Sequence, residues 1–137
     1  MQGFFIRLFG NNGVPWGVRV YPEQRVQVSA AHYRIADACV TRRSAPFEAI
    51  VRTAPLLCIE VLSQADRMSE MQERLDDYFG MGVGVVWLVD PRRRKAFIAE
   101  SNGTREVSEL VVPGTEIRVS VGEVFAELDE LEGMQLR

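Results

Sequence analysis

Apolar and polar positions in the first part of the chain predict a helix followed by strands. Apolar residues within positions 1–9 are spaced as on one face of a short amphipathic helix. Gly13 follows at a place where glycine commonly ends a helix. Residues 18–20 and 26–28 then alternate valine with polar residues, so we expect two strands, or one bent strand, with one buried face.

The middle of the chain is predicted to hold the central strands and a long helix. Residues 33–41 and 56–62 are predicted strands, and residues 66–81 carry apolar side chains at helical spacing. Gly82 marks the end of that helix, and residues 83–89 form another apolar strand. A helical crossover between two apolar strands favours parallel pairing of 56–62 with 83–89.

The last third of the chain predicts shorter elements. Residues 95–100 indicate a strand that turns at Gly103, residues 110–112 and 117–119 indicate edge strands, and residues 121–131 indicate a short final helix. The order of helix, strands, helix and strands predicts an α/β chain built on a mixed, α+β type of sheet.

Length and composition limit the classes of protein that fit. A chain of 137 residues is expected to fold as one domain, residues 1–137. Its 47% hydrophobic and 26% charged residues and its net charge of −3 argue against bulk electrostatic attraction to nucleic acid, although a locally basic cleft would still bind phosphate. No segment has the pattern of a signal peptide or a membrane span, so we expect a cytoplasmic protein.

The cysteines and the histidine argue against several kinds of site. Cys39 and Cys58 lie in apolar runs, which predicts core side chains in a reducing compartment and no disulfide scaffold. His32 is the only histidine and is interpreted as a surface residue. A structural zinc site and a Ser-His-Asp triad are therefore both disfavoured.

Asp37 is unexpected at its position in the predicted strand 33–41. Strand alternation would place Asp37 on one face with Ile35 and Cys39, and Ala36 and Ala38 on the other face. A carboxylate between two apolar neighbours on one face costs free energy unless it is paired, hydrogen-bonded or bound to a cation.

Glu60 is still more unusual, because every other residue of the strand 56–62 is apolar or cysteine. Two carboxylates of one sign on neighbouring strands need a positive partner. A hard divalent cation such as Mg²⁺, which takes oxygen ligands, would supply it. Ion pairs with arginine would serve equally well, and the pattern alone leaves both interpretations open.

The helix 66–81 carries a third group of charges. Asp66, Glu70, Arg74 and Asp77 are spaced by four, four and three residues, so they are predicted to line one face. That face could look over the end of the Glu60 strand, or it could be a solvated surface with ion pairs between successive turns.

Four segments together resemble a known family. They are Tyr-Arg-Ile-Ala-Asp-Ala-Cys-Val at 33–40, the strand that holds Glu60, the helix through 66–82, and Trp-Leu-Val-Asp-Pro at 87–91. The combination resembles the Uma-two family of restriction endonucleases over about residues 16–128. That family is similar to the PD-(D/E)XK nucleases.

The resemblance implies a fold and a metal site. It implies a restriction-endonuclease-like core with a crossover helix between the central strands, in a chain that is short at its amino-terminal side. It also implies that Asp37, Glu60 and the main-chain carbonyl of Val61 bind Mg²⁺, with Mn²⁺ as a substitute.

The resemblance also implies catalytic residues: Asp37, Glu60, Arg74 and Glu70. Leu62 occupies the position of the superfamily's usual lysine, and Arg74 stands where the family places a lysine on the following helix. Glu70 matches an acidic position one turn earlier. Arginine stays protonated, so Arg74 can supply charge and hydrogen bonds but cannot act as a base.

Two functions follow as expectations from this resemblance. The first is a Mg²⁺-dependent endonuclease that hydrolyses phosphodiester bonds of DNA. The second is a catalytically inactive nuclease fold that acts as a homodimeric binding or scaffold module, with Arg74 neutralising the carboxylates. No membrane partner is expected, and the candidate contacts to the DNA backbone are Arg42, Arg43, Arg92, Arg93 and Arg94.

Overall fold

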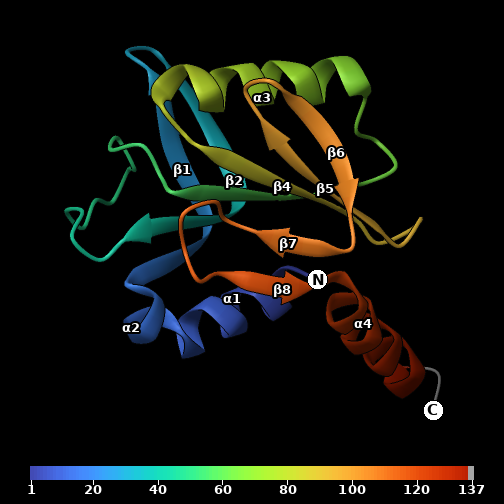
Figure 1. Ribbon diagram of the computed structural model, residues 1–137. Helices are drawn as coiled ribbons and strands as arrows, with labels where there is room; N and C mark the ends of the chain where they lie inside the picture. Colours follow the sequence, from blue (N-terminus) through green and yellow to red (C-terminus); the bar gives the residue numbers. More distant parts are fainter. Residues whose placement is uncertain (136–137) are drawn as a thin grey trace.

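The computed structural model describes residues 1–135 and is built around a six-stranded sheet in the order β1-β2-β3-β4-β5-β6 (Figure 1). Its strands are β1 (Val18–Ser29), β2 (His32–Arg42), β3 (Leu57–Val61), β4 (Val85–Asp90), β5 (Lys95–Glu100) and β6 (Gly103–Val107). The remaining elements are α1 (Gln2–Asn11), α2 (Gly13–Trp16), α3 (Met68–Met81), β7 (Glu109–Val111), β8 (Arg118–Ser120) and α4 (Val121–Gln135).

The predicted parallel pair forms the centre of the sheet. β3 pairs in parallel with β4, whereas the other neighbouring strands of the sheet are antiparallel. The connection between β3 and β4 contains α3, which ends at Met81 and is capped by Gly82 with a left-handed backbone, φ 107°. The mixed sheet and the crossover helix predicted from the sequence are therefore confirmed.

Each face of the sheet is covered by a different layer (Figure 1). α3 covers one face, where Leu75 and Tyr78 join a buried cluster of strand residues. The other face packs against α1, α4 and a separate two-stranded sheet made of β7 and β8. None of the helices within residues 1–135 is long and apolar enough to cross a membrane.

Residues 110–112 and 117–119 contribute to strands as predicted, but these strands do not lie at an edge of the main sheet. β7 and β8 pair with each other in a second sheet, and Leu110 and Ile117 are buried against the main sheet. Their apolar side chains cover a sheet face that α1 and α4 leave open, and burial of that face favours this layer over an edge position.

β1 and β2 change the direction of their side chains at one level. Ala36 packs in the cluster beside α3, whereas Ala38 packs in the cluster beside α1, although a regular strand would place both on one face. Glu23, opposite Asp37 in the register, has φ 42°. The predicted grouping of Ala36 with Ala38 is therefore wrong, because the paired strands are distorted at the level of Asp37.

Candidate functional site

Glu60 lies on β3 in the middle of the sheet and is 2% exposed. Its side chain meets α3, whose residues satisfy both carboxylate oxygens. The Tyr78 hydroxyl donates a hydrogen bond of 2.7 Å to Oε1, and Nη1 of Arg74 lies 3.2 Å from Oε2. Glu60 is thus a buried charge with one neutral and one cationic partner.

Asp37 lies next to Glu60 on the neighbouring strand. The β2–β3 ladder pairs Ala38 with Ile59, so the register continues to Asp37 opposite Glu60. Asp37 is half-buried, and its Oδ2 accepts a hydrogen bond of 2.7 Å from the main-chain N–H of Val61. The sheet therefore brings Asp37 and Glu60 together on neighbouring strands, as predicted, and the main chain of Val61 lies beside them.

The electrostatics of this pair leave it short of positive charge. Burial raises the pKa of Glu60, the hydrogen bond from Tyr78 lowers it, the charge of Asp37 raises it, and Arg74 lowers it, with a net rise to about 7. Burial and the charge of Glu60 also raise the pKa of Tyr78, so its hydroxyl remains a donor. One arginine does not compensate two carboxylates in this setting.

The donor atoms at this point suit a hard cation. No group of three or more histidine, cysteine, aspartate or glutamate side chains could hold a metal within residues 1–135. A cation here would therefore take oxygen atoms from two carboxylates and add a backbone carbonyl or water. Oδ1 of Asp37 accepts no hydrogen bond from any residue within 1–135, so this oxygen is available to a ligand. The residues present therefore fit an oxygen-coordinated divalent ion.

The charged residues of α3 do not share one role. Arg74 reaches Glu60, and Asp77 pairs with Arg34 of β2 at 2.8 Å. Glu70 is exposed one turn before Arg74, and Asp66 lies ahead of the helix, where it accepts a hydrogen bond from the main chain of Ser63. The prediction fails only for Asp66, which precedes the helix, whereas Glu70, Arg74 and Asp77 keep the predicted spacing on α3. Of these three, Arg74 is the one that contacts Glu60.

The arginines proposed to contact DNA fall at opposite ends of the central strands. Arg92, Arg93 and Arg94 follow β4 at the end where Glu60 lies, since β3 and β4 are parallel. Arg42 and Arg43 lie at the other end, because β2 is antiparallel to β3. They cannot all line one short cleft.

Two of the three arginines after β4 are already paired within the protein. Arg93 contacts Asp90, and Arg94 contacts Asp129 and Glu132 of α4. At the end of the strands where Glu60 lies, Arg92 is therefore the member of this group without a carboxylate partner in the described chain.

Tyr78 is the residue of this site that sequence reasoning missed. The helical spacing of apolar residues within 66–81 includes its ring, which is buried in the cluster beside the sheet. A buried tyrosine hydroxyl needs a hydrogen-bond partner, and Tyr78 follows Arg74 by one turn. This spacing was the signal that could have paired it with Glu60.

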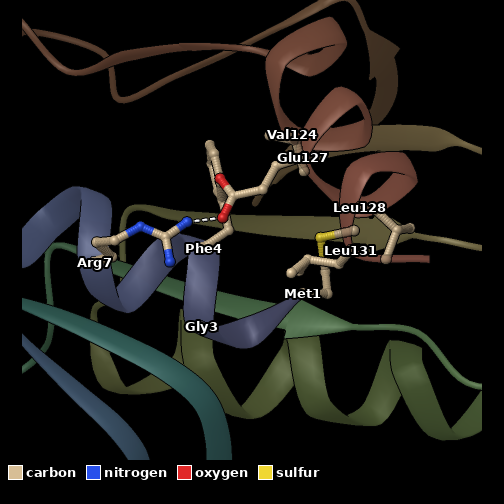
Figure 2. A pocket seen from close by; sticks show the side chains of 8 residues that line it. All are labelled: Met1, Gly3, Phe4, Arg7, Val124, Glu127, Leu128 and Leu131. Atoms are coloured by element: carbon tan, nitrogen blue, oxygen red, sulfur yellow. Dashed lines mark ion pairs between the residues drawn. The ribbon is translucent and has the colours of Figure 1, made fainter. Parts of the chain in front are cut away.

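A small cavity of about 80 Å³ lies elsewhere, between α1 and α4 (Figure 2). Apolar side chains from both helices line it, and Arg7 forms an ion pair with Glu127 across it. It holds one ion pair and no second carboxylate, so it lacks the two neighbouring carboxylates found at Asp37 and Glu60.

Comparison with known proteins places this arrangement in context. Residues 2–132 match the model of the family Uma2, described as "Putative restriction endonuclease". The chain is also similar to a solved structure from Anabaena variabilis ATCC 29413, "a putative nuclease belonging to DUF820", with a TM-score of 0.76 and 20% identity over 91% of this chain and 78% of that one.

A second solved structure, a complex of DrdV with DNA, matches with a TM-score of 0.50 and 14% identity over 96% of this chain and 11% of that chain. No curated protein matches this chain. At these low identities the two structures establish the fold, and the predicted restriction-endonuclease-like core is confirmed.

Proposed function

This chain belongs to the Uma2 family of restriction-endonuclease-like proteins, and from that premise we propose that it is a Mg²⁺-dependent endonuclease acting on phosphodiester bonds of DNA. The observation that carries the proposal is the buried carboxylate of Glu60 beside Asp37, with its pKa raised to about 7. Such a pair is costly to a fold that has no use for it.

The proposed metal ligands are Asp37, Glu60 and the main-chain carbonyl of Val61. Bound Mg²⁺ or Mn²⁺ would supply an activated water and would neutralise charge on the phosphate. The backbone N–H of Val61 orients Asp37 by its hydrogen bond to Oδ2, and the Tyr78 hydroxyl orients Glu60. Both carboxylates are therefore held in position before any ion binds.

Arg74 has a separate part in this proposal. Its side chain is 34% exposed, so it extends from solvent to the buried Glu60. With a cation bound at Glu60, the guanidinium of Arg74 would be free to donate hydrogen bonds to a phosphate. It adds charge without accepting a proton.

Glu70 is also a proposed catalytic residue, because it lies one turn before Arg74 on α3. Its carboxylate is exposed and would meet solvent or bound substrate rather than the buried part of the site. It is the weaker member of the proposed set.

A second function is favoured by one specific observation. Tyr78 and Arg74 already satisfy both oxygens of Glu60, as expected of a site that has lost its metal. The chain would then be a catalytically inactive nuclease fold, acting as a homodimeric binding or scaffold module. Arg74 reaches Glu60 but has no contact with Asp37 among the described residues, and this favours the enzyme.

The two functions are separated by nicking of supercoiled plasmid DNA in Mg²⁺ or Mn²⁺. Asp37→Asn and Glu60→Gln should each abolish nicking, while Arg105→Gln, on an exposed strand distant from the carboxylates, should not change it. Folded wild-type protein without activity in either ion supports the scaffold. Activity that survives both carboxylate substitutions rules out the proposed site.

A further inference from the structure

A second hollow, of about 290 Å³, lies at the opposite end of the central strands from Glu60. It is formed by the turn between α1 and α2, the beginning of β1, and the loop that leaves β2 at the left of Figure 1. Arg43 lies six positions beyond Asp37, which is about 20 Å at about 3.3 Å per strand residue. This hollow is therefore not a part of the carboxylate site.

Two arginines line the hollow without a carboxylate partner. Nε of Arg43 donates to the main-chain oxygen of Gly13 at 3.1 Å, and Arg19 extends toward the main-chain oxygen of Ala45 at 3.5 Å. Neither forms a salt bridge to an acidic residue within residues 1–135. Their charges are thus available to an anion.

The guanidinium of Arg43 lies close against the main chain at Gly13, to which its Nε donates. A Cβ atom at residue 13 would lie 2.8 Å from Nη2 of Arg43 and 3.0 Å from the main-chain oxygen of Val18, so the glycine leaves room for this close approach. The main-chain N–H of Arg43 also donates to Gly17 at 2.8 Å. A pre-positioned guanidinium loses less entropy when it binds a phosphate.

An exposed aromatic ring stands at the rim of the same hollow. Phe47 is 76% exposed, and its ring centroid lies 5.7 Å from that of Tyr21. The adjacent carboxylate of Glu48 accepts hydrogen bonds from the main-chain N–H groups of Arg52 and Thr53. These bonds stabilise the loop and direct the carboxylate toward the main chain. A braced, exposed ring beside free guanidinium groups is a stacking surface for a flat, anionic ligand.

We propose that this hollow binds a nucleotide unit: the base stacks on Phe47 and the phosphate is bound by Arg43 and Arg19. A base supplies a flat ring that stacks on the aromatic side chain, and the phosphate supplies the negatively charged partner that the two arginines lack. The unit can belong to a single-stranded nucleic acid or to a free nucleotide. The proposal requires neither Asp37 nor Glu60, so it stands apart from the nuclease function.

The test is fluorescence anisotropy of a labelled oligothymidylate of about ten nucleotides, in EDTA so that no divalent ion contributes. Phe47→Ala should weaken binding about tenfold, because one stacked base is lost. Arg43→Gln should weaken binding and lower the slope of log affinity against log salt by about 0.7. Arg105→Gln removes the same charge from an exposed strand at the other edge of the sheet and should leave affinity unchanged.

Competition then separates the two sources of the ligand. If thymidine monophosphate displaces the oligomer, one nucleotide is sufficient, whereas far weaker displacement means that a strand is the ligand; both results support the site. Displacement by inorganic phosphate as effective as that by the mononucleotide overturns the role of Phe47. The proposal is also overturned if the oligomer does not bind. It is likewise overturned if Glu60→Gln changes the affinity for the oligomer while Phe47→Ala leaves it unchanged.

Discussion

Replacing Glu60 by glutamine should change how the stability of the protein depends on pH. In the folded protein the pKa of Glu60 is raised from 4.5 to about 7, mainly by burial. A carboxyl group with a raised folded pKa binds its proton more tightly in the folded state than in the unfolded state. Its contribution is therefore complete below about 4.5 and is lost as pH rises toward and through about 7.

The size of the effect follows from the shift. A rise of about 2.5 pKa units corresponds to about 3 kcal/mol of unfolding free energy, lost between the two pKa values. Glutamine has nearly the same shape, stays neutral, and its carbonyl can accept the hydrogen bond from Tyr78. The metal-free variant should therefore match the wild type near pH 5 and exceed its stability by about 3 kcal/mol near pH 8.

Urea denaturation in EDTA at several pH values between about 5 and 8 measures this difference. Glu109→Gln is the matched control, because Glu109 is exposed and paired only with Arg118 at the surface. Its stability curve should run parallel to that of the wild type. If the stability curve of Glu60→Gln also runs parallel to that of the wild type, the ionised carboxylate of Glu60 does not lower the stability of the fold, and the reasoning is refuted.

Three further predictions concern single side chains. Tyr78→Phe leaves Oε1 of Glu60 without its donor and should cost about 1–3 kcal/mol of unfolding free energy in urea denaturation; unchanged stability would show that this hydrogen bond is unimportant. Arg74→Lys places a group that can lose its proton beside Glu60 and should raise the initial rate of plasmid nicking about a hundredfold at alkaline pH, whereas an unchanged or lower rate would show that the site does not lack a base at this position. Burial raises the pKa of Asp90, but hydrogen bonds from the chain at Arg93 outweigh it and the net pKa is lowered. Asp90→Asn should therefore be less stable than the wild type at neutral pH. As pH falls through the carboxyl range, the unfolding free energy of the variant should decrease less than that of the wild type. An equal decrease in both proteins, measured by urea denaturation, would refute this.

The centre of the fold could be predicted because its pattern has one interpretation. A nearly continuous apolar strand, a helix with one apolar stripe and a second apolar strand fit a parallel crossover and little else. The place of β7 and β8 could not be predicted, since alternating apolar residues are equally suited to a sheet edge and to a separate covering layer. The choice depends on which part of the main sheet the helices leave uncovered.

The candidate site was predictable in its carboxylates and not in their surroundings. Asp37 and Glu60 stand out because charge is rare in apolar strands, and the register of β2 and β3 brings them together. The change of side-chain direction beside Asp37 depends on the left-handed backbone of Glu23, which no residue type signals there. The role of the Tyr78 hydroxyl could not be predicted because the ring of Tyr78 fits the apolar stripe of α3.

The most direct test of the carboxylate metal site is titration calorimetry of Mg²⁺ and Mn²⁺ into the wild-type protein and into Asp37→Asn and Glu60→Gln. The site predicts binding by the wild type, with release of protons near neutral pH because an ion displaces the proton of Glu60, and loss of that binding in both variants. Wild-type protein that is folded and binds neither ion, or variants that bind as the wild type does, would contradict it.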